Sequence, residues 1–259
     1  MGKRVNVLGV GISPLNLLSA VEAFRKAIET RRKGYVCVTG VHGVSEAQEN
    51  LAFRAILNAS FLNTPDGMPM VWMGRWQGRR EMNRVYGPDL LLEVCRASEQ
   101  ANWRHFFYGG GPGVAEQLAA SLQSRFPKLT VAGTHTPPFR PLDEQETEEL
   151  RALVAEKKPD IIWVGLGTPK QEVFMSGILP RLDTTLMIGV GAAFDLLSGR
   201  MRQAPRWVQR SGFEWLHRLI QEPGRLGKRY LKNNPLFIWR VFLQLTGLRR
   251  YTLDEKHEA

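Results

Sequence analysis

The sequence is poor in cysteine and has no long apolar run. Its 259 residues include 2 cysteines, Cys37 and Cys95, which lie in apolar segments far apart along the chain. Two such residues predict reduced thiols in the core of a cytoplasmic protein, because disulfide frameworks need more cysteines and an oxidising compartment. The longest apolar run, at 236–245, is interrupted by Arg240 and Gln244. A membrane-spanning helix needs about 20 apolar residues, so we expect no spanning segment.

The chain also lacks the signals of several other protein classes. The apolar stretch after Met1 is short and is broken by Asn6, so it fits neither a signal peptide nor a myristoylation signal. The turn at 9–14 has no third glycine of a dinucleotide-binding fingerprint, and the next expected strand ends in Thr39 rather than in an acid. Both departures weigh against an enzyme that uses nicotinamide or flavin.

Basic residues are concentrated near the C-terminus. Residues 200–250 contain twelve Lys and Arg against two acids, Glu214 and Glu222, and this window carries the whole net charge of +10. Elsewhere, 23 of the 35 basic residues balance 23 of the 25 acidic ones. Aromatic residues such as Trp215 and Trp239 are interleaved with the cations. A neutral body with a basic, aromatic tail predicts an acidic partner, either a membrane surface or a nucleic acid.

Short β-branched and aromatic segments alternate with longer amphipathic ones. The expected strands cover 5–8, 35–39, 105–108, 129–132, 161–165 and 186–190. The expected helices cover 17–31, 45–57, 88–101, 114–125 and 143–157. This alternation predicts a Rossmann-like α/β fold, with a mostly parallel sheet flanked by helices. Beyond residue 200 only helical, basic segments remain, broken by Pro205, Pro223 and Pro235, so we expect a sheet domain at 1–200 and a helical appendage at 201–259.

Several of the expected strands end in glycine, at 9 and 11, 109–111, 165 and 167, and 189 and 191. Ligands of open α/β sheets bind outside the carboxyl ends of the strands, so these turns are expected to build the site. The turn with Gly109 and Gly110 also opens a helix, which places its amides to face a phosphate. A turn with no ligand is an equal alternative at this position.

The run Gly-Leu-Gly-Thr-Pro-Lys-Gln-Glu at 165–172 lies where a strand turns into a helix. Thr168 is expected to cap this helix and Pro169 to take its first position. Lys170 and Gln171 then lie at the positive end of the helix. A well-made cap is the simpler interpretation, but it does not explain Lys170, because a cation at this end of the helix dipole needs an anion nearby.

Acids and an arginine lie near other strand ends. Asp66 stands between a proline and a glycine, and it is either a turn former or a general base. Asp195 follows the last strand and either accepts hydrogen bonds from a ribose or caps a helix. Arg84 precedes Asp89, and the simplest role of Asp89 is to cap the next helix.

Together these patterns resemble the WecG/TagA/CpsF glycosyltransferases. The resemblance covers nearly the whole chain in the right order, and the run at 165–172 and the basic tail are its most specific parts. It is carried by Thr39, Asp66 with Gly67 and Met68, Arg84 with 87–89, the turn at 109–111, the runs at 165–172 and 189–195, and the tail from Ala204 through Trp215, Arg218, Glu222, Pro223 and Arg225.

The resemblance implies an activity and a location. Members of that family transfer a sugar from a UDP-sugar to a polyprenyl-diphosphate-linked sugar, with inversion at the anomeric carbon. They act at the inner face of the bacterial plasma membrane in the synthesis of teichoic acid, capsule or exopolysaccharide. By position, Asp66 matches the general base of the family, and Thr39, Arg84 and Gln171 match residues that line its pocket.

The remaining expected site residues lie in the tail and at the strand-end turns. Arg218 and Arg225 match appendage arginines that dock on the anionic membrane and close over the site, and Arg229 shares a helix face with Arg225 through its spacing of four. The UDP-sugar is expected to bind at the strand-end turns, through Gly109, Gly110, Gly165, Gly167, Thr168, Pro169, Lys170 and Asp195.

Two positions depart from the family pattern. Val41, followed by His42, stands where relatives carry Asn, and Ser13 stands where many carry Asp. Both positions are expected in the pocket, so a hexose is at least as well supported as N-acetylmannosamine, and His42 either touches a sugar or is structural. No Asp-any-Asp pair occurs, so we expect transfer without a metal or other cofactor.

The composition of the tail also bears on which partner the protein binds. No nucleic-acid reading motif accompanies the basic residues, so nucleic acid is not an expected partner of the enzyme. The alternative from another class is a non-catalytic peripheral protein that binds anionic lipid or nucleic acid through its tail. A homo-oligomer, the two sugars and the polymer are left open by the sequence.

Overall fold

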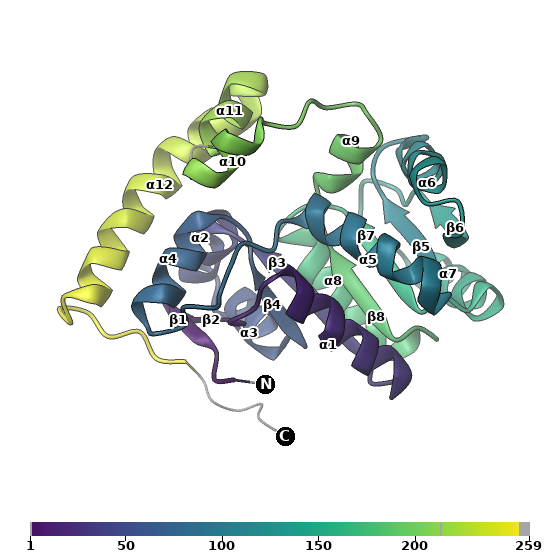
Figure 1. Cartoon of the computed structure of the whole chain (residues 1–259), viewed down its shortest axis with the longest axis horizontal. Helices are drawn as coiled ribbons and strands as arrows, with labels where there is room; N and C mark the ends of the chain where they lie inside the picture. Colours follow the sequence, from purple (N-terminus) through teal and green to yellow (C-terminus); the bar gives the residue numbers. More distant parts are fainter. Residues whose placement is uncertain (1, 213, 254–259) are drawn as a thin grey trace.

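A six-stranded parallel sheet forms the centre of the protein (Figure 1). The computed structural model describes residues 2–212 and 214–253, and for residues 206, 209, 210, 218, 225, 226, 228 and 229 it describes the backbone alone. The sheet has the order β4-β3-β8-β7-β5-β6. Its strands are β3 (Gly34–Thr39), β4 (Leu62–Pro65), β5 (Arg104–Gly109), β6 (Thr130–His135), β7 (Ile161–Gly165) and β8 (Leu186–Gly189).

Helices cover both faces of this sheet. One face packs against α1 (Leu17–Glu29), α5 (Gly87–Ala101), α6 (Val114–Arg125) and α9 (Ala193–Leu197). The other face packs against α2 (Val41–Glu49), α3 (Leu51–Ala59), α7 (Glu144–Lys157), α8 (Lys170–Ile178) and the short helix η1 (Leu179–Arg181). The α/β architecture predicted from the alternating segments is confirmed.

The first expected strand does not join the sheet. Val5–Val7 (β1) pairs with Val10–Ile12 (β2) in a separate antiparallel hairpin. The prediction that Gly9 and Gly11 end a sheet strand and help to build the site is therefore wrong. Apolar side chains of the hairpin pack in a second core cluster with α2, α3 and α4 (Met68–Trp76), which explains why the segment has the composition of a buried strand.

The expected helix at 45–57 consists of two helices. The chain breaks at Asn50, whose side chain accepts a hydrogen bond of 3.0 Å from the N–H of Phe53 and so caps α3. The sequence analysis also missed α4 (Met68–Trp76), which begins directly after Gly67. This helix is short, and it carries Trp72 and Trp76 on its exposed side as well as Met70 and Met73 on its buried side, so apolar residues show no strong helical period in the sequence.

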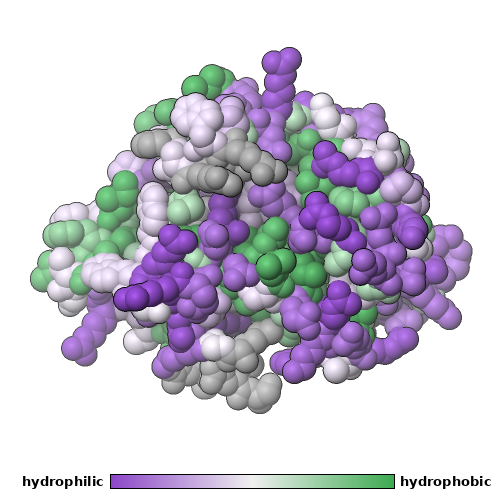
Figure 2. All heavy atoms as spheres, in the orientation of Figure 1, coloured by the Kyte–Doolittle hydropathy of each residue, from purple (hydrophilic) through white to green (hydrophobic). Residues whose placement is uncertain are grey.

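The tail is helical, as expected, and consists of α10 (Arg206–Ser211), α11 (Glu214–Gln221) and α12 (Pro223–Leu245). Pro235 was expected to break a helix, but it lies inside α12. Figure 2 shows apolar side chains gathered over α12, where Ile238, Trp239 and Phe242 are exposed. Within the described part of the chain, no helix combines the length and the apolar character needed to cross a membrane.

The far half of the tail is attached to the sheet domain. Phe237 is buried in the second core cluster, beside the β1–β2 hairpin. The side chain of Gln244 accepts a hydrogen bond from the N–H of Leu8, at 2.9 Å, and donates one to the carbonyl of Asn6, at 3.0 Å. The boundary near residue 200 therefore separates the sheet from the helices, while α12 packs on the same core as the hairpin.

Candidate functional site

A cavity of about 1680 Å³ lies between the carboxyl edge of the sheet and the tail. One side, the sheet wall, is formed by strand-end residues at 40–43, 66–67, 110–111, 165–171, 189–193 and 195. The opposite side, the helical wall, is formed by Ser211, Gly212, Glu214, Trp215, Tyr230, Asn233, Asn234, Phe237, Ile238, Val241 and Leu245. Met68, Trp72 and Trp76 of α4 join the two walls. The cavity thus lies at the strand ends, where the sequence analysis expects the site.

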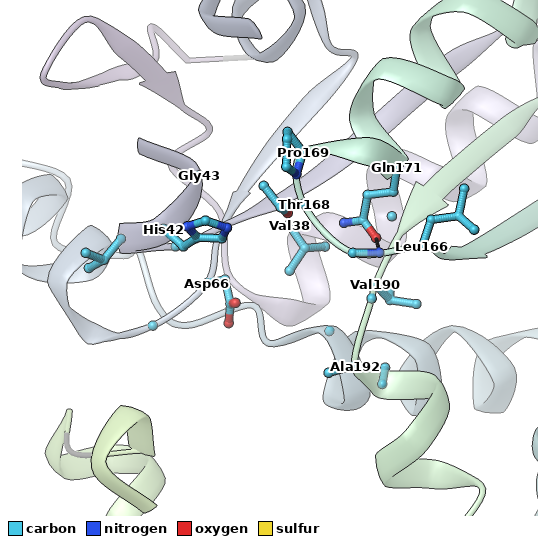
Figure 3. A pocket seen from close by; sticks show the side chains of 18 of the residues that line it. Val38, His42, Gly43, Asp66, Leu166, Thr168, Pro169, Gln171, Val190 and Ala192 are labelled. Atoms are coloured by element: carbon cyan, nitrogen blue, oxygen red, sulfur yellow. Dashed lines mark hydrogen bonds between the residues drawn. The ribbon is translucent and has the colours of Figure 1, made fainter. Parts of the chain in front are cut away.

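Asp66 follows β4 directly and lines the cavity. Its backbone N–H donates to the carbonyl of Thr39 at 3.0 Å, which ties the ends of β3 and β4 together. A Cβ atom on Gly40 would lie 2.8 Å from the carbonyl oxygen of Asp66, so this approach of the two turns requires glycine. Figure 3 shows the side chain of Asp66 extending into the cavity from the turn after β4. The backbone contacts at the sheet edge thus hold residue 66 on the cavity.

The run at 165–172 forms a tight turn into α8, but its cap differs from the prediction. The N-cap residue is Pro169, preceded by a cis peptide bond, and the helix begins at Lys170. Thr168 is not the cap, because its hydroxyl donates to Oε1 of Glu172 at 2.8 Å. Gly167, Thr168, Pro169 and Lys170 line the cavity, and Lys170 is exposed at the first turn of α8, as predicted.

Gln171 is buried at the base of this turn, yet its side chain reaches the cavity (Figure 3). Its Oε1 accepts a hydrogen bond of 3.2 Å from the N–H of Gly167, and its Nε2 donates one of 3.0 Å to Glu172. A Cβ atom on Gly189 would lie 2.9 Å from the amide carbon of Gln171, so a side chain at the end of β8 would displace this amide. The amide of Gln171 is thus held at its oxygen by Gly167 and at its nitrogen by Glu172.

The glycine turn after β5 was predicted to face a phosphate with its amides, and the structure places these amides differently. Gly109 does not line the cavity, whereas Gly110 does. The N–H of Gly110 donates to the carbonyl of Gly165 at 3.0 Å, so this amide holds two strand ends together instead of facing a phosphate. Gly165 and Gly110 therefore shape the floor of the cavity through backbone pairing.

Thr39 and Arg84, both expected in the pocket, are placed differently. Thr39 is buried behind Gly43 and does not line the cavity. Arg84 does line it, but its guanidinium forms an ion pair with Glu214 of α11 and stacks over Tyr86 with 4.0 Å to the ring centre. Sequence reasoning missed Glu214 as a site residue, because no local signal marks a partner 130 positions away.

Of the two positions that depart from the family pattern, one lines the cavity and the other does not. Val41 and His42 line the cavity, and Nδ1 of His42 lies 3.4 Å from Nδ2 of Asn233 and 3.6 Å from Oε1 of Glu46. Ser13 was expected in the pocket, but it is buried away from it and exchanges two hydrogen bonds with the backbone of Asn63. Position 13 therefore has no contact with the cavity.

The other predicted site residues lie on α9 and on the helices of the tail. Asp195 lies in the first turn of α9 and lines the cavity, while the N-cap of α9 is Ala192. The side chains of Arg218, Arg225 and Arg229 lie outside the described residues, and the backbone places Arg218 on α11 and the other two on α12. Among the described residues, no three His, Cys, Asp or Glu side chains gather closely enough to hold a metal ion.

Two charged residues in the first turn of α8, Lys170 and Glu172, lie in different surroundings. Lys170 carries a positive charge at the exposed N-terminal end of the helix, where the helix dipole adds to it. Glu172, two residues later, is 1% exposed, and burial raises its pKa. The sheet wall thus combines two carboxylates, Asp66 and Asp195, with the Gln171 amide and the Lys170 cation, a set that suits proton removal from a hydroxyl and binding of an anion.

Comparison with known proteins identifies a family and several relatives. The family model described as "Glycosyl transferase WecG/TagA/CpsF family" matches residues 5–251. A protein of Bacillus spizizenii (strain ATCC 23059 / NRRL B-14472 / W23), named N-acetylglucosaminyldiphosphoundecaprenol N-acetyl-beta-D-mannosaminyltransferase, is 28% identical over 221 residues, which cover 82% of this chain and 84% of the relative. A protein of the same name from Bacillus subtilis (strain 168) is 28% identical over 218 residues, with 81% and 80% covered. A third, from Staphylococcus aureus (strain MW2), is 25% identical over 240 residues, with 92% of both chains covered.

Proposed function

Because this chain belongs to the WecG/TagA/CpsF family and is a glycosyltransferase, we propose that it moves a sugar from a UDP-sugar to a polyprenyl-diphosphate-linked sugar, with inversion. The relatives are named for transfer to N-acetylglucosaminyldiphosphoundecaprenol, which supports an acceptor of this type. The observation that carries the mechanism is the position of Asp66 in the cavity, at the end of β4 and within the sheet wall that also holds the turn at 165–171.

Asp66 acts as the general base in this proposal. Its carboxylate accepts the proton of the acceptor hydroxyl while that oxygen forms a bond to the anomeric carbon of the donor. The bond between the anomeric carbon and the phosphate oxygen breaks on the opposite face, and UDP leaves with the bonding electrons. A single displacement of this kind inverts the anomeric centre.

The leaving UDP gains negative charge in the transition state. Lys170 and the N-terminal end of α8 lie on the cavity and stabilise that charge. Arg218 and Arg225, from the family resemblance, and Arg229, from its spacing of four from Arg225, are proposed to add to this stabilisation and to membrane docking. We propose that transfer needs no metal, which agrees with the absence of an Asp-any-Asp pair from the sequence.

The tail brings the site to the membrane. Exposed apolar residues of α12 lie beside basic ones, and each cation near an anionic surface contributes about 1 kcal/mol to binding. Aromatic side chains such as Trp239 add burial at the interface. We therefore place the enzyme at the cytoplasmic face of the plasma membrane, as a peripheral protein of cell-envelope polysaccharide synthesis.

The proposal allows two classes of donor sugar, a hexose or an N-acetylhexosamine. The relatives are named for N-acetylmannosamine transfer, whereas this chain has Val41 and His42 at the cavity. An imidazole beside a sugar site adds a hydrogen-bonding group to it, so the sugar contacts of this chain need not match those of its relatives.

The proposal is tested by UDP release. The wild-type enzyme is given a panel of UDP-sugars with a polyprenyl-diphosphate-linked N-acetylglucosamine acceptor, beside Asp66→Asn and the exposed control Asp183→Asn. We expect one or more donors to turn over, and Asp66→Asn to lower kcat roughly a hundredfold to ten-thousandfold, because the base is removed. Asp183→Asn is expected to match the wild type. Equal turnover by Asp66→Asn would show that Asp66 is not the base.

A further inference from the structure

Glu172 is a buried carboxyl group beneath the cavity. Its side chain is 1% exposed and does not line the cavity. One oxygen, Oε1, accepts hydrogen bonds from the hydroxyl of Thr168 at 2.8 Å and from Nε2 of Gln171 at 3.0 Å. The other oxygen, Oε2, has no hydrogen-bond partner among the described residues. Burial of a carboxyl group with half of its acceptors unused costs folding free energy, so a purely structural role explains it poorly.

The hydrogen bonds of Glu172 select one orientation of the Gln171 amide. A carboxamide has an acceptor end and a donor end of similar size, and a half-turn exchanges them. In the observed orientation Oε1 accepts from the N–H of Gly167 and Nε2 donates to Glu172. The reversed orientation would oppose two donors at Gly167 and two acceptors at Glu172. Both contacts therefore favour the same orientation.

This orientation decides what Gln171 offers to a ligand. One hydrogen of Nε2 is used by Glu172, which leaves the second hydrogen on a side chain that lines the cavity. The amide lies beside Lys170 at the N-terminal end of α8, where the helix dipole favours negative charge. An N–H at this place suits an oxygen of a phosphate group. The reversed amide would present a carbonyl oxygen instead and would repel the same group.

We infer that Glu172 is a positioning residue, which holds the Gln171 amide with its N–H toward the diphosphate of the nucleotide-sugar donor. The inference rests on the proposed function for the identity of the donor. Only one oxygen of Glu172 is used, and burial raises the pKa of the group, so an uncharged acceptor at the same place serves equally well. A glutamine at position 172 supplies such an acceptor, and a methionine of similar length supplies none.

The test compares Glu172→Met with Glu172→Gln, and uses Glu149→Met on the exposed side of α7 as the matched control. Affinity for UDP is measured by calorimetry, and KM and kcat are measured with the best UDP-sugar. We expect Glu172→Met to raise the Kd of UDP and the KM of the donor about tenfold, with kcat changed much less, since one hydrogen bond to the diphosphate is lost. Glu172→Gln is expected to recover most of this loss. Glu172→Ala is made as well, in case the methionine does not fold.

The outcomes separate the inference from the proposed function. If the Kd of UDP is unchanged in Glu172→Met and Glu172→Ala, or if Glu172→Gln is as impaired as they are, the positioning role is wrong. If the effect of Glu172→Met persists in full when Gln171 is already replaced by methionine, Glu172 does not act through Gln171, which also overturns the inference. If the wild-type enzyme binds UDP but transfers from no UDP-sugar, the proposed function fails while calorimetry still decides the role of Glu172.

Discussion

The two walls of the cavity are built on different physical principles. In the sheet wall, polar groups are fixed by hydrogen bonds, such as those from Gly110 to Gly165 and from Gln171 to Glu172. In the helical wall, apolar side chains dominate, and Phe237 packs inward while Ile238 remains exposed. Rigid polar groups suit recognition of a charged ligand and the chemistry on it. An apolar, partly exposed wall suits contact with lipid.

The walls also differ in how they are attached. The sheet wall continues the core of the sheet, and its turns are short. The helical wall meets the sheet domain through a few contacts that are distant in sequence, including the ion pair of Arg84 with Glu214, the pair of Lys232 with Glu49 and the packing of Phe237. Changes in these contacts should therefore loosen the helical wall while leaving the sheet wall intact.

The largest effect is expected at Phe237. Removing this buried ring by Phe237→Ala should lower the free energy of unfolding by about 3 to 5 kcal/mol, since it leaves a cavity in the cluster that joins α12 to the hairpin. Trp239→Ala, two residues along the same helix and 57% exposed, should change it by about 0.5 kcal/mol or less. Chemical denaturation measures both. Similar losses for the two variants would mean that α12 does not pack as described.

A smaller effect is expected at the ion pair between the walls. Glu214→Gln removes the charge that faces Arg84, and both side chains are largely shielded from solvent. We expect the amide hydrogens of α11 to exchange about tenfold faster, which corresponds to roughly 1.4 kcal/mol of local stability. Glu156→Gln, an exposed pair member on α7, is the control and should leave this exchange unchanged. Unaltered exchange in Glu214→Gln would show that the pair does not hold α11.

The sequence predicted the sheet wall better than the helical wall. Strands such as 161–165 carry their own pattern of β-branched residues, and the turn at 165–172 follows directly from one of them. The hairpin at β1 and β2 was misassigned, because a short apolar segment has the same composition whether it pairs in the sheet or outside it.

Errors at the site arose where long-range packing decides the outcome. Thr39 stands at an expected strand end and Ser13 in the turn after another, yet the first lies behind Gly43 and the second bonds to Asn63. The partners of Arg84 and of α12 come from distant parts of the chain, and spacing in the sequence carries no signal for them. The role inferred for Glu172 likewise depended on seeing its hydrogen bonds.

The most direct test of the different roles of the two walls is to measure the affinity for UDP after one side chain of each wall is replaced. Lys170→Gln removes a cation from the sheet wall, and Ile238→Ala removes an apolar group from the helical wall. Calorimetry with UDP should show a Kd raised about tenfold or more for Lys170→Gln, because a charge-assisted contact is lost, and a Kd within about twofold of the wild type for Ile238→Ala. Equal losses in the two variants, or a larger loss in Ile238→Ala, would contradict the assignment of nucleotide binding to the sheet wall.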